Sequence, residues 1–347
     1  PSDFRFRLRH LWRLIWCLPY WLLRRPRAMV EMAEALVNGS IPTVLNFFEN
    51  LLGLGVALCW AGPWSARYRH LHAVWASGPG TVAWAVNRLT GIPYSLAGHA
   101  YDLFEGGGDG WLKWKLRGAT FVRSSTKAGL RRWEQLGAGA PRHLIRRGLA
   151  TLPQPWQGDP PRPPYRLLTV GRMVEKMGHA YLCAVLFELK RLGVSFQFQL
   201  VGDGPLRGET EARLERMGLL EEVELEGALP FGAVERCYAS ADLFIFSGVV
   251  ARNGDRAGFP NAIAEAMAWG VPVAATPVGG VAEVIQDDLN GIVLTFDPCL
   301  DARRIASLLE DPAACARFSR AGREWIETHF RADRAMQELL RLINANS

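Results

Sequence analysis

The most informative stretch of the chain lies in its second half and reads Gly258-Phe259-Pro260-Asn261-Ala262-Ile263-Ala264-Glu265-Ala266-Met267-Ala268. A polar loop leads into it, and a helix is predicted to begin near its proline, because a proline in the first helical turn sacrifices no helical hydrogen bond. The loop glycines let backbone N–H groups approach a ligand, and the start of a helix adds partial positive charge. The stretch therefore predicts a site for a phosphate or for sugar hydroxyls.

A carboxylate, Glu265, lies inside this predicted helix among small apolar residues, where it needs a partner such as a pair of ligand hydroxyls. A predicted strand at 271–276, a turn at Gly279-Gly280 and a short helix with Glu283 follow. Strand, glycine turn and helix in this order place ligands at the carboxyl ends of a parallel sheet. An ordinary α/β crossover with a tight turn has the same features, so these elements alone leave both readings open.

The amino-acid sequence of these segments resembles the donor-binding half of the retaining glycosyltransferases of family four. These enzymes have the GT-B fold and include the bacterial polysaccharide and lipid-sugar enzymes. The resemblance is carried by 253–261, 265–268, 270–273 and Gly279-Gly280 with Glu283, and upstream by 171–178 and 202–205. It implies an α/β protein of two Rossmann-like lobes, each a doubly wound parallel sheet, that face a cleft. It also implies a nucleotide-sugar substrate, no other cofactor and no metal.

The resemblance implies a role for each matching residue. The arginine after the first strand of the donor lobe would stabilise charge on the leaving phosphate, because a guanidinium stays charged and grips two oxygens. Glu265 would bind the nucleotide ribose, and the backbone near Gly258 the donor sugar and phosphate. The residues implied in donor binding are Gly171, Gly258, Phe259, Pro260, Asn261, Glu265, Gly279 and Gly280, and those implied in catalysis are His99, Arg172 and Lys176.

Two positions depart from the family pattern. Ala257 stands where the family has the first of two acids, and Met177 stands where it has a phosphate-binding lysine. Lys176 lies one position earlier than that lysine, and Asp255 lies two positions before Ala257, so each is a candidate substitute. A non-catalytic relative that binds a nucleotide-sugar or a partner protein is therefore the main alternative to an active enzyme.

Strand and helix patterns alternate from His70 onward, which predicts a parallel sheet in the first lobe. His72, His99 and the run 91–93 resemble the acceptor half of the same family, in which the residue matched by His99 lies beside the transferred sugar. A lone histidine is otherwise more often a structural residue. The opening strand and glycine-rich loop of the family are not found, so the first lobe is predicted to lack its first strand–helix units.

The prolines between 153 and 164 predict a stiff connector and a domain boundary. We therefore predict an acceptor-side lobe at 1–157, a linker at 158–165 and a donor lobe at 166–320. A terminal helix at 321–347 is expected to pack back across the first lobe. The length of 347 residues is sufficient for two lobes with separate cores.

The net charge of +6 is concentrated at the front, because residues 1–27 hold seven arginines and one acid, Asp3. No nucleic-acid-binding motif accompanies this charge, so no nucleic-acid partner is predicted. The six cysteines have no paired spacing, which argues against zinc and disulfides and favours a cytoplasmic location.

Residues 4–25 interleave arginine with tryptophan, tyrosine and leucine, a composition that suits the headgroup layer of an anionic membrane. Arg13 and Pro19 interrupt the apolar run, which is too short to span a bilayer. A surface helix packed on its own domain is the alternative. A second apolar run at 43–64 is expected to form a buried helix.

The sequence thus predicts a hexosyltransferase that moves a sugar from a nucleotide-sugar to a polysaccharide or lipid-linked acceptor with retention of configuration. It would lie peripherally at the inner face of the plasma membrane. An epimerase or a dinucleotide oxidoreductase is a third reading, weakened because no G-x-G-x-x-G turn with a downstream acid is present.

Overall fold

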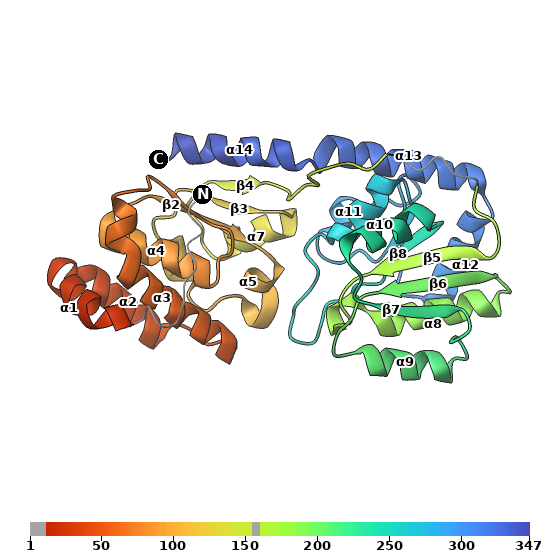
Figure 1. The fold of residues 1–347 in the computed structure, drawn as a ribbon, viewed down its shortest axis with the longest axis horizontal. Helices are drawn as coiled ribbons and strands as arrows, with labels where there is room; N and C mark the ends of the chain where they lie inside the picture. Colours follow the sequence, from red (N-terminus) through yellow and green to blue (C-terminus); the bar gives the residue numbers. More distant parts are fainter. Residues whose placement is uncertain (1–11, 155–159) are drawn as a thin grey trace. The chain divides into compact units, whose positions relative to one another are not determined.

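The computed structural model describes residues 12–154 and 160–347, which form two compact units (Figure 1). Unit 1 comprises Pro1–Ile145, Asn253–Asp255 and Met336–Ser347, and unit 2 comprises Arg146–Arg252 and Arg256–Ala335. The predicted boundary at 157/158 falls within 155–159, outside the described residues, as does the start of the predicted segment 1–27. Both stay predictions.

Unit 1 contains three helices followed by alternating strands and helices. Its elements are α1 (Leu14–Arg24), α2 (Pro26–Asn38), α3 (Val44–Ser65), β1 (Leu71–Ala73), α4 (Gly78–Thr90), β2 (Tyr94–Gly98), α5 (Ala100–Phe104), α6 (Leu112–Leu116), β3 (Val122–Ser124), α7 (Lys127–Gln135) and β4 (Arg142–Leu144). The four strands are parallel and lie in the order β1-β2-β3-β4. The parallel sheet predicted for this part of the chain is confirmed.

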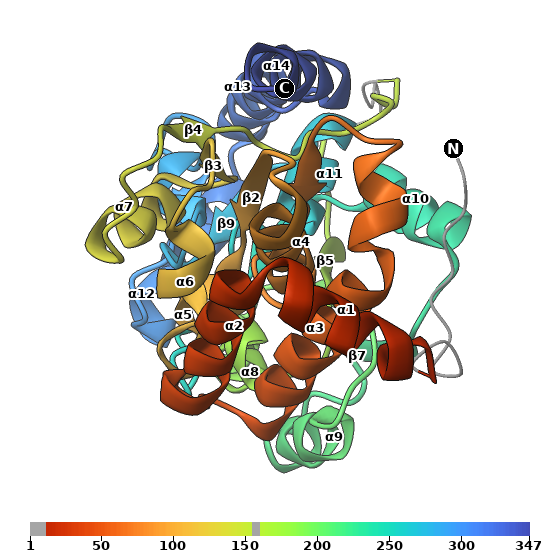
Figure 2. The same cartoon turned by 90° about the vertical axis from the view of Figure 1, so that its left-hand side faces the viewer.

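The order of these strands determines how the sheet is covered. Because parallel crossovers are right-handed, strands that follow one another across a sheet send their connecting helices to the same face. Figure 2 shows α4 on that face and the terminal helix α14 (Ala332–Ala345) on the opposite one. A hydrogen bond of 3.2 Å between His70 Nδ1 and the carbonyl of Asn346 joins the sheet to the end of the chain.

Helix α3 is only partly the buried helix that the sequence predicts. Its second half is in the core, but Leu45 and Phe48 in its first half are exposed. The polar residues Asn46 and Asn50 are buried instead, because they bond to Asp109. Among the described helices, α3 alone is long and apolar enough to cross a membrane by length and composition, and just over half of its most apolar window is buried.

Unit 2 contains a six-stranded parallel sheet and its covering helices. Its elements are β5 (Tyr165–Val170), a 3-10 turn (Glu175–Met177), α8 (His179–Arg191), β6 (Phe196–Val201), α9 (Arg207–Arg216), β7 (Val223–Gly227), α10 (Phe231–Ser240), β8 (Leu243–Phe246), α11 (Asn261–Trp269), β9 (Val273–Ala275), a 3-10 turn (Val281–Glu283), β10 (Ile292–Val293), α12 (Pro298–Leu309), α13 (Pro312–His329) and the beginning of α14.

The strand order β10-β9-β8-β5-β6-β7 is doubly wound, as the sequence predicts for this lobe. The chain runs outward from β5 to β7, then returns to β8 on the other side of β5. Strand β8 is apolar throughout because both faces of the sheet are covered: Leu243 and Ile245 join one core, and Phe244 and Phe246 the other. The reversal between β5 and β8 makes their carboxyl ends the expected ligand-binding edge.

Candidate functional site

The loops after β5 and β6 pack against each other at this edge. Gly202 has φ +142°, and a Cβ on it would lie 1.8 Å from the carbonyl oxygen of Gly171. The backbone N–H of Met173 donates to the carbonyl of Asp203 at 2.9 Å. The two glycine turns found in the sequence therefore have a packing reason for their glycines, and they hold the loop of Arg172 in place.

Arg172, the predicted phosphate contact, is exposed, and within residues 12–154 and 160–347 its guanidinium has no carboxylate partner. Its carbonyl oxygen lies 3.3 Å from Nε2 of His179, the first residue of α8. Burial lowers the pKa of His179, and its Nδ1 is buried without a hydrogen-bond partner in the described chain. Sequence reasoning did not select His179, although its place directly after Gly178 at a helix start was a usable signal.

Met177, which replaces the expected lysine, turns back onto the loop. Its Cε would lie 2.2 Å from a Cβ at Gly171, so the methionine side chain occupies the space that Gly171 leaves. Lys176 is half-buried, and its carbonyl accepts from the N–H of Val249 at 3.0 Å. The structure therefore places Met177 in packing contact, and the catalytic role of Lys176 stays a prediction.

The loops before α11 and after β9 are joined directly. The N–H of Gly280 donates to the carbonyl of Gly258 at 2.6 Å, and Gly279 has φ +64° with no room for a Cβ beside the carbonyl of Ala257. Residues far apart in the sequence that were predicted to bind the donor thus meet at one place. A Cβ on Gly258 itself would meet nothing within 4 Å, so this glycine borders open space.

The start of α11 leaves backbone donors available. Pro260 is the N-cap residue, in an extended conformation, and no side chain in the described structure caps the helix. The first N–H groups of a helix have no partner inside it, so an uncapped start attracts anions. Asn261 is the first helical residue. The proline lies one residue before the helix, rather than inside it.

Phe259 has a structural contact besides its predicted backbone role. Its ring packs edge to face on Phe330 with centroids 5.1 Å apart, and lies 6.3 Å from the ring of Trp325. The aromatic cluster therefore anchors the loop before α11 to the carboxyl end of α13.

Glu265 lies on α11 with one carboxylate oxygen engaged. Oε2 accepts a hydrogen bond of 2.9 Å from the hydroxyl of Tyr238, on α10. Burial, and then the charge of Glu265, raises the pKa of Tyr238 well above its usual value. In the described chain no group donates to Oε1, and that oxygen is not buried. Tyr238 was missed, because its separation of 27 residues from Glu265 gave no local signal.

Ala257 is buried in an apolar cluster of unit 2 with Phe246 and Ile263. Asp255, the suggested substitute, belongs to the segment Asn253–Asp255 of unit 1, and its N–H bonds to the side chain of Asn253. The position that the family pattern gives to an acid is therefore filled by a core methyl group.

The predicted acceptor-side residue His99 lies in unit 1, at the carboxyl end of β2. Its Nε2 is 3.0 Å from the carbonyl of Val74, so this nitrogen carries the ring proton, and its ring lies 4.8 Å from that of Trp75. The carboxylate of Asp102 accepts from the backbone N–H groups of His99, Ala76 and Ser77 at 3.1–3.3 Å. One side chain thus binds the loops after β1 and β2 together.

The charge of Asp102 is held in a buried polar network. Burial raises its pKa to about 6, although the backbone N–H groups of His99 and Ala76 and the charge of Lys115 oppose the shift. Nearby, the fully buried Lys115 pairs with Asp109 at 2.7 Å and donates to the carbonyls of Ala76 and Ser77. Burial lowers the pKa of Lys115, and Asp109 opposes that effect. This network stiffens the loop that precedes α4.

His72 lies on the sheet face opposite α4 and is not exposed at a ligand edge. Its Nδ1 is 2.8 Å from the hydroxyl of Ser95, and its Nε2 accepts from Arg123 at 3.1 Å. Burial, and then Arg123, lowers the pKa of His72 to about 3, so the ring is neutral. His72 is therefore a structural residue of the sheet.

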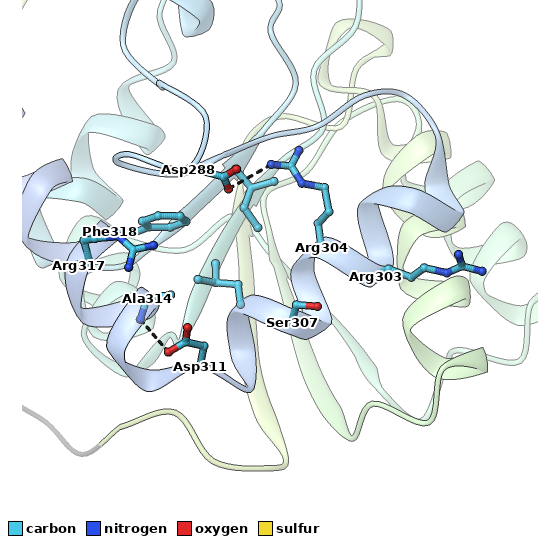
Figure 3. Close-up of a pocket in the computed structure, with 10 residues that line it drawn as sticks. Asp288, Arg303, Arg304, Ser307, Asp311, Ala314, Arg317 and Phe318 are labelled. Atoms are coloured by element: carbon cyan, nitrogen blue, oxygen red, sulfur yellow. Dashed lines mark hydrogen bonds and ion pairs between the residues drawn. The ribbon is translucent and has the colours of Figure 1, made fainter.

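A separate cavity of about 320 Å³ lies beside β10, between α12 and α13 (Figure 3). Arg304 pairs there with Asp287 and Asp288, while Arg303 points away from the cavity. None of the predicted donor-binding residues lines it. Over 12–154 and 160–347, no group of three or more His, Cys, Asp or Glu side chains could hold a metal ion.

Comparison with known proteins supports the same reading of unit 2. Residues 164–311 match the family of glycosyl transferases group 1. WcaL of Escherichia coli, named for colanic acid biosynthesis, is 31% identical over 187 residues, which cover 53% of this chain and 46% of WcaL. The amylovoran biosynthesis glycosyltransferase AmsK of Erwinia amylovora is 29% identical over 184 residues, 52% of this chain and 44% of AmsK. The chain thus spans about half the length of the curated relatives it matches.

Solved structures support the fold over about 85% of the chain. HepE of Anabaena, in complex with UDP, has a TM-score of 0.67 at 18% identity and covers 85% of this chain and 82% of its own. Sucrose-phosphate synthase of Thermosynechococcus elongatus has a TM-score of 0.68 at 21% identity over 84% of this chain and 78% of its own. Residues 164–311 are therefore similar to glycosyl transferases group 1, and the chain has the GT-B fold of these solved structures.

Proposed function

We propose that this chain is a metal-independent retaining glycosyltransferase that moves a sugar from a nucleotide-sugar to a polysaccharide or lipid-linked acceptor. The proposal is carried by three features that follow strands of the unit 2 sheet on the side of their carboxyl ends. These are the exposed guanidinium of Arg172, the joined Gly258 and Gly280 loops, and the open oxygen of Glu265. The relatives' names and the UDP in the HepE structure support the choice of donor.

Each feature has a chemical task in the proposed reaction. Cleavage of the sugar–phosphate bond develops negative charge on the leaving phosphate, and the fixed charge of Arg172 would stabilise it, with Lys176 as a second cation. The uncapped start of α11 and the backbone at Gly258 would bind the donor phosphate and sugar. Oε1 of Glu265 would accept hydrogen bonds from the ribose hydroxyls, while Tyr238 fixes the orientation of the carboxylate. His99 would lie beside the transferred sugar.

Calorimetric titration with UDP, GDP and their sugar derivatives tests the donor site. We expect one nucleotide to bind, and Glu265→Gln to weaken that binding by about tenfold or more, because hydrogen bonds to a charged group are lost. Glu215→Gln, on the exposed face of α9, is the matched control and should bind as the parent does. Equal binding by both variants would remove Glu265 from the site.

Turnover separates the enzyme from a non-catalytic relative, the second candidate. That candidate is favoured by the packing of two apolar side chains. Ala257 occupies the position of an acid in the family pattern, and Met177 occupies the position of a lysine. Transfer to an acceptor, with the anomeric configuration of the product read by proton NMR, supports the enzyme and tests retention. Tight nucleotide binding without transfer or hydrolysis of the sugar-nucleotide would favour the non-catalytic relative.

We also propose that the protein works in the cytoplasm, at the inner face of the plasma membrane, through the basic aromatic segment at its front. The run of arginine, tryptophan and tyrosine in residues 12–27 supports this location.

A further inference from the structure

The three helices that precede β1 form the layer of unit 1 farthest from its sheet, on the far side of α4 (Figure 2). Trp21 of α1 donates to the carbonyl of Leu58 of α3 at 2.8 Å, Met32 and Ala35 of α2 are buried, and the second half of α3 lies in the core. What they present outward is unusual for a protein surface.

Helix α1 is apolar on all sides between its flanking arginines. Its inner side carries Trp21, whereas Ile15, Trp16 and Leu23 on the other side are 69%, 71% and 85% exposed. A helix with apolar residues around its whole circumference belongs in a core or in contact with lipid. The protein covers one side of α1, so the other side requires an apolar neighbour.

In the first half of α3, polar side chains face the protein and apolar side chains face outward, the reverse of an ordinary surface helix. Asn46 and Asn50 point inward to Asp109, while Leu45 and Phe48 are exposed. Val44, Leu51 and Leu52 are exposed as well. A water-facing helix normally shows the opposite arrangement, so this half of α3 also faces an apolar medium.

Cations are concentrated at the ends of α1 and the start of α2, whereas the acids of this layer, Glu31, Glu34 and Glu49, lie farther along α2 and on α3. Arg13 stacks on Trp60 at 4.8 Å and Arg24 on Tyr20 at 5.7 Å, and neither they nor Arg25 and Arg27 pair with an acid in the described chain. Unpaired arginines beside tryptophan and tyrosine match the anionic headgroup layer of a bilayer, where cations and amphipathic rings are both favoured.

We propose that α1, α2 and the first half of α3 form a docking surface that inserts into the headgroup layer of an anionic lipid bilayer. The docking surface comprises Trp12, Ile15, Trp16, Leu23, Val37, Leu45 and Phe48, with Arg13, Arg24, Arg25 and Arg27 at its edge. It deepens the membrane location proposed above, because it extends past the basic segment to α3. It does not depend on the donor site.

Flotation with vesicles tests the surface. The whole protein should float with vesicles of phosphatidylglycerol and phosphatidylethanolamine and remain below vesicles of phosphatidylcholine. The double variant L45S/F48S should lose at least about tenfold in vesicle partition, because two apolar side chains no longer enter the bilayer. The matched control is L220S/F231S, which removes an exposed Leu and Phe from unit 2 and should float as the parent does.

Charge is tested in the same assay. R25Q/R27Q should reduce flotation with the anionic vesicles, and R303Q/R320Q, an equal change of charge on exposed residues of unit 2, should not. Thermal melts and nucleotide titration of all variants check that unit 2 is intact, so loss of vesicle binding is distinguishable from failure of the donor site.

Three results would overturn the proposal. The parent protein does not float with either vesicle, or L45S/F48S floats as the parent does. The third result is that neither protein binds vesicles, and that sedimentation equilibrium shows the parent as a dimer and L45S/F48S as a monomer. The docking surface would then be an interface between two copies of the chain.

Discussion

The hydroxyl of Tyr238 donates a hydrogen bond of 2.9 Å to Oε2 of Glu265, and so fixes the one carboxylate of α11 from the neighbouring helix α10. The phenol is buried, and its raised pKa keeps it protonated as a donor throughout the physiological range. The carboxylate can then offer only its other oxygen to a ligand, in a set direction.

Tyr238→Phe should therefore weaken nucleotide binding by several-fold while leaving Glu265 in place, and should cost about 1–3 kcal/mol of unfolding free energy. Tyr181→Phe is a matched control, because Tyr181 also donates to a carboxylate of unit 2, that of Asp301. It should lower stability comparably and leave nucleotide affinity unchanged. Equal affinity losses in both variants would mean that the effect is general loosening of unit 2.

Arg172→Ala should lower nucleotide-sugar affinity or turnover by about tenfold or more, because a charge-assisted phosphate contact is worth about 1.5–3 kcal/mol. The guanidinium makes no ion pair in the described chain, so the melting temperature should change little. Titration and turnover are compared with those of Arg216→Ala, on the exposed side of α9. An Arg172→Ala protein that binds and turns over as the parent does would exclude the phosphate contact.

Ala257→Glu introduces the acid of the family pattern, but the site is in an apolar cluster. We expect a loss of about 1–3 kcal/mol in unfolding free energy, from crowding and from desolvation of the new carboxylate. Ala313→Glu, at an exposed position of α13, should be nearly neutral in the same urea titration. A gain of transfer without loss of stability would instead show that the loop opens to accept the acid.

The lowered pKa of His72 leads us to expect that the stability of unit 1 depends on pH. Its pKa is about 3 in the folded protein and 6.5 in the unfolded chain, so the unfolded chain takes up a proton first as the pH falls. The stabilisation is therefore complete above 6.5 and is lost progressively between 6.5 and about 3. His72→Asn removes this titration, so urea unfolding of the variant should depend less on pH across that window. An unchanged pH profile would refute the assignment of His72 as a neutral, partly buried residue of the sheet.

The parallel strands and the turns of unit 2 were predictable because they are local signals. Strand β8 is apolar at every position since both its faces are buried, and Gly202 and Gly279 have backbone angles that favour glycine. Arg172 and Glu265 were identified from a resemblance in their surroundings, and the structure places both in unit 2. Their roles stay predictions until the titrations are made.

The alternation of strands and helices, the glycine turns and the asymmetric charge at the front can all be recognised in the amino-acid sequence, since each depends on neighbouring residues. Three contacts become visible in the folded chain alone: Tyr238 holds Glu265, Met177 covers Gly171, and α3 turns its asparagines inward. The first and third of these contacts join residues that are 27 and 63 positions apart, and the second depends on how the chain turns between Gly171 and Met177. A buried carboxylate or lysine must be neutralised by whatever the fold brings beside it, and no local pattern specifies that partner.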